Sequence, residues 1–441
     1  MSTIAHPSSQ QMENDIRHIT AHDAAVAPGD IAIGVIIGRA SEYFDFFVYG
    51  IASVLVFPSV FFPFAPRLEG TLWAFVVFSF AFVARPFGTA LFMAIQRRWG
   101  RSTKLTAALF LLGFSTAGMA FLPEYKYLGF ASIVLLSTLR IFQGIALGGS
   151  WDGLPSLLAL NAPEDRRGWY AMLGQLGAPI GFAIATSLFL YLHTELTQAE
   201  FLDWGWRYPF YVAFAINVVA LFARLRLIVT EEYTKLLEER KLRPTPVLAL
   251  LKRQGYNIFI GGFAALASYA LFHIVTVFPL SWIALGNTQS VNEVMSVQLV
   301  GAGLFVIGMI LSGWIADRIG RRQTLGLCAS SIAVLSGFAP TLLSGSAAAQ
   351  DLFILLGFAL LGLSYGQAAG AVTANFSTKY RYAGAALTAD FAWLVGAAFA
   401  PLVALGLSAN FGLGYLSLYL LSAALCTLAA LKWNQSLEGR D

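Results

Sequence analysis

Charged side chains are scarce in this chain of 441 residues. Asp, Glu, Lys and Arg together make up 12% of it, whereas hydrophobic residues make up 57%, and the mean hydropathy is +0.68. A chain with so few charges cannot cover a water-facing surface with polar groups. The composition therefore excludes an ordinary water-soluble protein and indicates a chain whose surroundings are mainly lipid.

Cysteine is also rare, which limits the chemistry. Cys328 and Cys426 both lie in apolar runs, which favours buried small side chains over a disulfide or a metal site. His and carboxylate residues show no metal-ligand spacing, and no Gly-Lys-Ser/Thr phosphate loop is present. We also find no nucleophile and base pair. The sequence therefore predicts no metal, no cofactor, no ATP-driven step and no enzyme activity.

Long apolar runs dominate the chain. A membrane-spanning helix needs about 20 mostly apolar residues, and barrel strands are much shorter, at about 10 residues. Because lipid offers no partners to backbone groups, we expect an all-α integral membrane protein. Twelve spans are predicted, over residues 31–57, 71–95, 103–122, 129–160, 168–192, 207–227, 256–284, 294–316, 323–344, 351–374, 382–406 and 414–433. The polar first 30 residues show no signal-peptide pattern.

The basic residues fall mostly in loops on one side of these spans. Of the 28 Lys and Arg, only Arg67, Lys126 and Arg207 fall in the opposite loops. Basic loops stay in the cytoplasm, so we expect both termini to be cytoplasmic and the protein to lie in the inner (plasma) membrane. Because the positive charge is spread over loops and not gathered on one face, we expect no nucleic-acid partner.

A repeated charged turn indicates an internal duplication. Gly313 is followed by Asp317-Arg318-Ile319-Gly320-Arg321-Arg322, and a degraded copy, Arg97-Arg98-Trp99-Gly100-Arg101-Ser102, lies 220 residues earlier, half the chain length. Each turn lies between the second and third spans of its half. We expect a cytoplasmic tail at 1–30, a six-helix bundle at 31–227, a cytoplasmic linker at 228–255, a second bundle at 256–433 and a tail at 434–441. The linker is either a short interfacial helix or a solvated connection.

The first span carries three charges along one stripe. Arg39, Glu42 and Asp45 are spaced i, i+3, i+6, which places them on one helix face. A carboxyl group inside a membrane costs several kcal/mol unless it has a partner or a purpose. Asp45 is either a proton switch, neutral when isolated and ionised when an arginine approaches, or half of a static ion pair. Glu42 has the same two roles open to it, because Arg39 can neutralise it.

Other spans contain further ionisable residues. Arg140 is the cation we expect for Asp45, with Gln143 nearby as a hydrogen-bonding group. Arg85, before Pro86, either pairs internally or holds an anionic substrate group. Asp390 has no cation in its own span and is either a proton carrier or a hydrogen-bond acceptor. His273 could carry a proton near neutral pH, or it could be a packing residue.

At these residues the chain resembles the major facilitator superfamily and, within it, the metabolite–proton symporter family. The resemblance covers nearly the whole chain. It rests on the segments Glu42–Gly50, Arg85–Gly88, Arg140–Gly144 with Gly148-Gly149, Gln175–Pro179, Trp204–Phe210, Gly313–Arg322 and Arg381–Gly384. The chain departs from the family pattern at several positions, namely Arg39, Met93, Arg97, Ser150, Ala374, Ser377 and Asp390. Asp152 lies on the wrong helix face to replace the acid lost at Ser150.

The resemblance implies two pseudo-symmetric six-helix bundles that expose a central cavity to either side in turn, the major facilitator fold. The resemblance also implies a cytoplasmic gate, in which Asp317 and Arg321 hold neighbouring helix ends together in one state and release them in the other. The first-half copy of this turn lacks the acid and should hold less strongly. The expected gate residues are Gly313, Asp317, Arg318, Gly320, Arg321, Arg98, Gly100 and Arg101. We assign proton coupling to Asp45, Glu42, Arg140 and Asp390. We expect substrate contacts from Arg39, Arg85, Tyr49, Gln143, Gln175 and His273.

Three functions follow, in order of preference. The first is a secondary active transporter that takes up a small polar metabolite, an organic acid or zwitterion, together with protons. The second is a proton-driven efflux antiporter with the same architecture. The third is a non-transporting membrane sensor, which a long signalling extension would favour, although few residues follow Trp433. The expected partners are a small-molecule substrate, protons and membrane lipid, and we expect a monomer.

Overall fold

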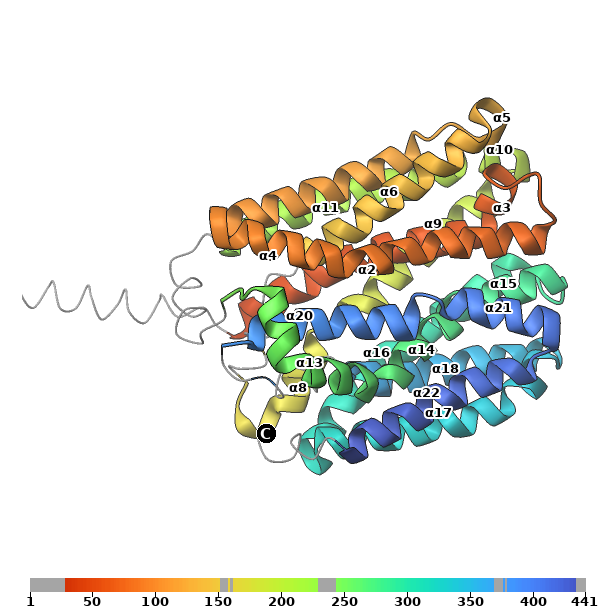
Figure 1. Cartoon of the computed structure of the whole chain (residues 1–441). Helices are drawn as coiled ribbons and strands as arrows, with labels where there is room; N and C mark the ends of the chain where they lie inside the picture. The colour runs from red at the N-terminus through yellow and green to blue at the C-terminus, as the bar shows by residue number, and fades with distance from the viewer. Residues whose placement is uncertain are drawn as a thin grey trace, which may run out of the picture.

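The computed structural model describes residues 28–150, 158, 162–228, 243–368, 376 and 379–433. Every regular element in these ranges is helical, as the composition predicts. Long helices lie side by side along one common direction, with most of the first half of the chain in one layer and the second half in the other (Figure 1). This is the arrangement expected of a chain that must pair its backbone groups within each span. The first-half segment Arg167–Leu173 lies among the helices of the second half (Figure 1).

The first half begins with α2 (Pro28–Leu55) and the short α3 (Phe57–Val60). The remaining elements of this half are α4 (Arg67–Ala120), α5 (Tyr125–Leu128), α6 (Phe130–Gly149), η1 (Glu164–Arg166), α8 (Arg167–Leu173), α9 (Gly177–Glu195), α10 (Gln198–Asp203), η2 (Gly205–Arg207) and α11 (Tyr208–Ile228).

The second half consists of α13 (Val247–Ala264), α14 (Leu266–Thr276), α15 (Phe278–Gly286), α16 (Val291–Ile319), α17 (Arg321–Leu343), α18 (Ala347–Ala368), α20 (Arg381–Ala392), η3 (Trp393–Ala397), α21 (Ala400–Phe411) and α22 (Gly414–Trp433). Element η3 is one turn of π-helix. Pi-helical turns inside α-helices occur frequently at functional sites.

The twelve predicted spans are all present in the described part of the chain. Ten helices or helix pairs there are long and apolar enough to cross a membrane. One of them, α4, contains two spans that meet at Gly100, and α2, which carries the charged stripe, supplies the twelfth. The predicted ends of the fourth and tenth spans, beyond Gly149 and Ala368, fall largely outside the described residues.

Helix α13 begins at Val247, inside the predicted linker, because Pro246 precedes its first turn and has no backbone donor to continue a helix backwards. The last part of the predicted linker is therefore helical. The apolar stretch long enough to cross a membrane here is Leu266–Gly286, which lies mostly within the predicted seventh span. The interfacial helix proposed between residues 228 and 242 lies outside the described residues, as do Asp152, Ala374 and Ser377.

The two charged turns adopt the same backbone shape. Gly100 has φ +88° and ψ 173°, and Gly320 has φ +86° and ψ 150°. Residues other than glycine rarely adopt positive φ, so glycine is required at both turns. The duplication predicted from the sequence is thus present in the backbone, including in the copy that has lost its acid.

Glycines also bring corresponding helices into close contact in the two halves. A Cβ at Gly88 of α4 would collide with the backbone of Ile145 in α6, and a Cβ at Gly308 of α16 would lie 2.7 Å from the carbonyl oxygen of Ala359 in α18. Gly88 and Gly308 are 220 residues apart. Small residues allow helices in lipid to approach closely and so gain dispersion contacts.

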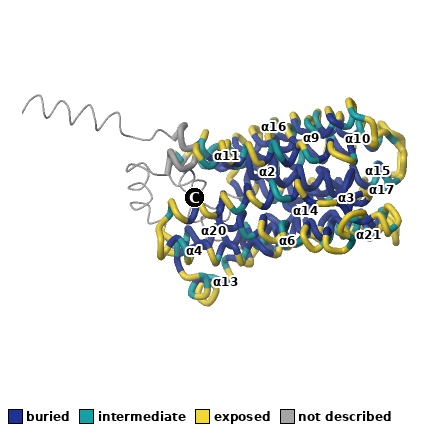
Figure 2. The backbone as a smooth tube through the Cα atoms, turned by 90° about the horizontal axis from the view of Figure 1, so that it is seen from above, coloured by how far each residue is buried: buried dark blue, intermediate teal, exposed yellow. Residues whose placement is uncertain are grey.

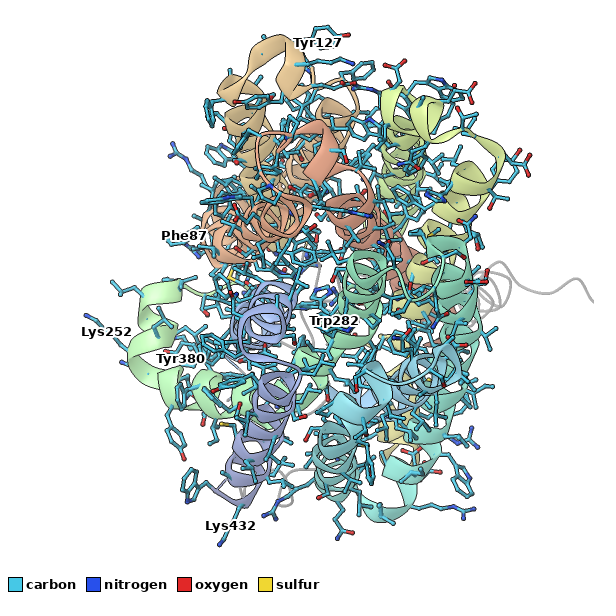
Figure 3. The ribbon with its side chains drawn as sticks, turned by 90° about the vertical axis from the view of Figure 1, so that its right-hand side faces the viewer. Phe87, Tyr127, Lys252, Trp282, Tyr380 and Lys432 are labelled. Carbon is cyan, nitrogen blue, oxygen red and sulfur yellow. The ribbon has the colours of Figure 1, made fainter. Side chains whose placement is uncertain are left out.

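The outer surface of the bundle is apolar. Exposed residues lie at the periphery of the helix bundle in Figure 2. They include the large apolar residues Phe87, Phe110 and Phe222, which are 70%, 71% and 68% exposed. Phe87 lies at the edge of the bundle when it is viewed along the helices (Figure 3). By contrast, Glu42, Asp45, Arg85, Arg140 and Asp390 are all buried. The charged side chains of the spans therefore point inward, as the sequence requires.

Candidate functional site

An ion pair joins the two bundles. The Nε of Arg85 in α4 donates to Oδ1 of Asp390 in α20 at 2.7 Å, and the hydroxyl of Thr89 donates to the other carboxylate oxygen. The side chains of Arg85 and Asp390 are only 7% and 3% exposed. Of the two roles left open for Arg85, the structure therefore shows internal pairing. The partner of Asp390 lies 305 residues away, which explains why no cation was visible near it in the sequence.

Aromatic rings pack directly beside this ion pair. Trp393 stacks on Phe46 with ring centroids 5.7 Å apart and planes 6° apart, and on Phe82 at 5.7 Å and 25°. Phe46 and Phe82 stack on each other at 5.2 Å. This three-ring stack contains residues of both bundles. Further rings pack around it, namely Tyr43, Phe47, Tyr269, Phe272, His273 and Tyr365.

The hydroxyls of Tyr43 in α2 and Tyr365 in α18 are hydrogen-bonded to each other across the bundles. His273 lies within the aromatic cluster and is 1% exposed. Its Nδ1 lies 3.5 Å from the hydroxyl of Thr276, whereas its Nε2 has no hydrogen-bond partner within the described residues. His273 therefore packs as an aromatic ring and also presents one free polar atom at the interface.

Asp45 is bonded to a residue that the sequence did not suggest. The amide nitrogen of Asn217 in α11 donates to Oδ2 of Asp45 at 2.7 Å, and the hydroxyl of Ser41 donates to the amide oxygen of Asn217 at 2.7 Å. The other oxygen of Asp45, Oδ1, has no hydrogen-bond partner among the described residues. One carboxylate oxygen is thus held in place and the other is left available.

Arg140 does not form the predicted ion pair with Asp45. It donates to the carbonyl oxygen of Phe78 at 3.2 Å and to the side chain of Gln143, and its guanidinium lies 3.9 Å from the ring centroid of Tyr49. Gln143 in turn donates to Thr116 at 3.1 Å. The cation is buried and is stabilised mainly by an aromatic face and by neutral oxygens.

The remaining charges of the first span neutralise each other. Arg39 donates to Glu42 at 2.9 Å, which is the pairing that the sequence left open. The other carboxylate oxygen of Glu42 accepts a hydrogen bond from Ser150 at 2.9 Å. Ser150 is one of the positions at which this chain departs from the pattern of the family that it resembles. In the structure its hydroxyl binds the carboxylate of Glu42 on α2.

The charged turn of the second half contacts the opposite bundle. Oδ1 of Asp317 accepts hydrogen bonds from the backbone of Gly168 at 2.6 Å and Trp169 at 3.3 Å, and Oδ2 accepts from Trp169 at 3.2 Å. Arg321 donates to the carbonyl oxygen of Arg167 at 3.3 Å. The backbone groups that these two side chains bind belong to Arg167, Gly168 and Trp169, the first three residues of α8. The acid therefore meets the first free N–H groups of a helix, where negative charge is favoured.

The degraded first-half turn makes a different contact. Tyr382 at the start of α20 donates to Gln96 at 3.0 Å, and Lys104 donates to the same hydroxyl at 3.2 Å. Arg97, which replaces the acid, donates to the carbonyl oxygen of Thr245 at 3.3 Å. The first-half turn is thus held to the second half by Gln96, Lys104 and Tyr382 and by the bond from Arg97.

The other predicted gate residues lie on the same two turns. Gly313 packs against α8, where an added Cβ would lie 2.9 Å from Cγ of Met172. Arg318 lies over the ring of Trp314 at 3.6 Å, and Arg98 over that of Trp99 at 5.0 Å. Arg101 is half-buried on its own turn. Gln175 is buried in the turn between α8 and α9.

Sequence reasoning missed several residues of the site. Asn217, Thr89, Tyr365 and Trp393 are ordinary polar or aromatic residues in apolar helices, and none carries a charge that demands an explanation. Of these residues, Asn217 carried the clearest signal in the sequence, because an amide inside a membrane span needs hydrogen-bond partners. Within the described residues, no group of three His, Cys, Asp or Glu could hold a metal ion.

The sequence from residue 46 to 401 matches the family model described as Major Facilitator Superfamily. The chain belongs to the major facilitator superfamily. It is 36% identical over 409 residues to the inner membrane metabolite transport protein YhjE of Escherichia coli strain K12, covering 91% of this chain and 92% of that protein. The family assignment and the helical membrane fold agree with the sequence-based expectations.

Two further comparisons extend this result. The shikimate transporter of Escherichia coli strain K12 is 29% identical over 409 residues, which cover 91% of this chain and 92% of that one. The crystal structure of a D-xylose-proton symporter superimposes with a TM-score of 0.70 at 19% identity, covering 93% of this chain and 98% of that one. This structural likeness shows the fold. The chain is therefore a multi-pass membrane protein of a family whose named relatives are metabolite transporters.

Proposed function

We propose that this protein takes up a small polar metabolite, an organic acid or a zwitterion, together with protons, by alternating access. One observation carries the proton coupling. Asp45 is fully enclosed by protein, with one oxygen bonded to Asn217 and the other without a protein partner among the described residues. A buried carboxylate needs compensation, and binding a proton supplies it.

Arg140 is the cation that adjusts this acid. It lies on α6 beside the ring of Tyr49, and Tyr49 is one helical turn from Asp45 on α2. If α6 moves relative to α2 as the bundles rock, the distance between the guanidinium and the carboxylate changes. A nearer cation favours the ionised acid and a more distant one favours the protonated acid, so rocking and proton transfer become coupled.

The contacts of Asp317 and Arg321 supply the conformational part of the cycle. Both residues bind the start of α8 in the opposite bundle, at the end of the molecule that carries the basic loops. We propose that these bonds hold that end closed and break when the bundles part. The relatives support transport as the activity, since one is named a metabolite transport protein and another a shikimate transporter.

The proposed location follows from the charges and from the relative named as an inner membrane protein. We place the chain in the inner (plasma) membrane with both termini in the cytoplasm, because most Lys and Arg residues lie at one end of the helices. We propose a monomer, since each chain contains both bundles and the interface between them.

The test is uptake into vesicles with an imposed pH gradient, with Asp45→Asn compared with the parent protein. We expect the gradient to drive uptake by the parent and not by the variant, because asparagine cannot bind a proton. Asp351→Asn is a matched control, since Asp351 accepts a hydrogen bond from Gln289 away from the central interface. Equal gradient-driven uptake by parent and Asp45→Asn would contradict the assignment. Export in inside-out vesicles would instead support the antiporter.

A further inference from the structure

We infer that the interface between α4 and α20–η3 is the substrate site and that its substrate is a carboxylate attached to a planar ring. In the structure, Asp390 occupies the place that the substrate carboxylate would take on Arg85. This inference rests on the transport activity proposed above and names the substrate class. The family resemblance does not supply it, because Asp390 is a position at which this chain departs from the family pattern.

The two helices present matching pairs of residues. Phe82 and Arg85 are three residues apart on α4, and Asp390 and Trp393 are three residues apart on α20 and η3, so each pair lies on one helix face. Arg85 meets Asp390 at 2.7 Å and Phe82 meets Trp393 at 5.7 Å between ring centroids. An ion pair and a ring stack thus lie one helical turn apart across the two bundles.

The polar half of this arrangement fits a carboxylate. Asp390 accepts one hydrogen bond from the guanidinium of Arg85 and another from the hydroxyl of Thr89. Charge-assisted bonds of this kind from arginine are strong and directional. A substrate carboxylate in the same position would receive the same two donors. The substrate can bind these donors only when the hydrogen bonds from Arg85 and Thr89 to Asp390 are broken. Asp390 therefore competes with the substrate carboxylate for the same two donors.

The apolar half fits a flat ring. Phe46, Phe82 and Trp393 are already stacked with their planes within 25° of one another. Inserting a planar ring between Phe82 and Trp393 as the bundles separate would replace one stack with two. An open hydrocarbon chain offers no flat face to this stack. Trp393 is also the first residue of the π-helical turn, a local geometry that occurs frequently at functional sites.

A second observation points to a ligand at this place. His273 is 1% exposed, and its ring centroid lies 5.9 Å from that of Phe82 and 6.1 Å from that of Trp393. Its Nε2 has no partner among the described residues. Buried polar atoms normally have a hydrogen-bond partner, so this atom suits a hydroxyl or carbonyl group on the ring, opposite the carboxylate.

Charge balance links binding to a proton. A substrate anion that takes over Arg85 leaves Asp390 buried without its cation, and a proton on Asp390 removes that cost. Entry of one carboxylate with one proton leaves the net charge of the site unchanged. The titratable and charged groups on the surrounding helices are Arg39, Glu42, Tyr43, Asp45, Arg85, Lys104, Arg140, Tyr269, His273, Tyr365 and Tyr382. Arg39 is paired with Glu42, Lys104 bonds the hydroxyl of Tyr382, and Arg140 lies against the ring of Tyr49. Arg85 is the cation that contacts Asp390 directly, so it is the one that would exchange one carboxylate for another.

The experiment measures ligand-induced thermal stabilisation of the full chain purified in detergent. The probes are benzoate, 4-hydroxybenzoate, benzamide as a neutral match for benzoate, and hexanoate as an open-chain carboxylate of similar size. A ligand that binds the folded protein raises its Tm. We expect benzoate to stabilise the parent more at pH 6 than at pH 8, and benzamide and hexanoate to have little effect at equal concentration.

Variants separate the parts of the site. Asp390→Asn removes the competitor, so benzoate should bind about tenfold more tightly and with little dependence on pH. The double variant Arg85→Gln with Asp390→Asn avoids an unpaired buried charge and should not respond to benzoate. Trp393→Leu should weaken benzoate binding, whereas His273→Phe should remove any preference for 4-hydroxybenzoate over benzoate. Asp351→Asn should match the parent.

The inference is wrong if hexanoate stabilises the parent as well as benzoate does, or if Asp390→Asn leaves benzoate affinity and its pH dependence unchanged. A comparison of the four probes on the parent decides the ring preference even where a variant does not fold. Because binding in detergent needs no gradient, its failure is distinct from a failure of gradient-driven uptake. Selective binding without uptake would leave this site standing and overturn the proposed transport.

Discussion

Asp317 on α16 accepts a 2.6 Å hydrogen bond from the backbone of Gly168 at the start of α8. One residue comes from each half of the chain, so this bond joins the two halves at the basic end. A Cβ on Gly168 would lie 2.7 Å from that of Ala316 and 2.8 Å from Oδ1 of Asp317. The contact therefore requires both the acid and the glycine, because the carboxylate reaches the backbone only where no side chain intervenes.

Replacing the acid should weaken this closure. Asp317→Asn keeps the size of the side chain but removes the charge that favours a helix N-terminus and its charge-assisted bonds, at a cost of about 1–2 kcal/mol. That cost corresponds to about a 5- to 30-fold shift toward the open end. We expect a lower initial rate of uptake with unchanged amounts of inserted protein. Arg97→Gln, at the matching place of the first half, should have less effect, because Arg97 makes one long bond to Thr245. Unaltered uptake by Asp317→Asn would count against the latch.

Filling the space at Gly168 should open the same end by a steric route. Gly168→Ala pushes α16 away from α8, so a cysteine placed at Gln367, which donates to the carbonyl oxygen of Gly168 at 3.1 Å, should react faster with a maleimide added from the basic side. Gly303→Ala on α16 is the matched control, because an added Cβ there meets nothing within 4 Å. Equal labelling in both variants would show that the contact does not hold the interface closed.

Tyr49 offers a test of how Arg140 is stabilised. Its hydroxyl has no partner among the described residues, whereas its ring lies 3.9 Å from the guanidinium of Arg140. An unpartnered buried hydroxyl costs about 1–3 kcal/mol, so Tyr49→Phe should unfold at an equal or higher temperature than the parent. Tyr49→Leu loses the aromatic face, worth about 2 kcal/mol for a desolvated cation, and should unfold at a lower temperature. Thermal unfolding in detergent measures both. A similar loss in the two variants would assign the stabilisation to the hydroxyl instead.

The opposite end of the molecule contains a pH-sensitive cap. Thr197 and Glu200 form a capping box at the start of α10, and hydrogen bonds from the hydroxyl and the backbone of Thr197 lower the pKa of Glu200 below its usual value of 4.5. A lowered folded pKa means that the stabilisation is present above the unfolded pKa and is lost as the pH falls through the folded one. Hydrogen exchange at residues 198–203, corrected for intrinsic rates, should therefore lose protection below pH 4.5 in the parent. In Glu200→Gln, protection should not change over that range.

Much of the fold followed from local patterns. The apolar runs, the two glycine turns and the 220-residue offset each depend on residues close together in the sequence, and the structure contains all three. The inward orientation of Asp45 and Asp390 also followed, because a charge facing lipid is too costly. The helix that begins at Val247 was not predicted, since its first turns include Lys252 and Arg253 and a charged helix outside an apolar run has no hydropathy signal to reveal it.

The partners of the charges could not be predicted in the same way. Asp45 was expected to meet Arg140 and instead bonds Asn217, whereas Asp390 meets Arg85. Many pairings would have satisfied the same charges. Which one forms depends on the distances and rotations between helices that are hundreds of residues apart in the sequence.

The amino-acid sequence by itself determined that this chain crosses a membrane twelve times as two related halves, because burial of backbone and charge in lipid allows few other solutions. Only the tertiary structure decided which side chains meet across the halves. Helix packing brings Phe82 onto Trp393 and Arg85 onto Asp390, and these contacts depend on close glycine approaches and helix rotation that no single segment encodes.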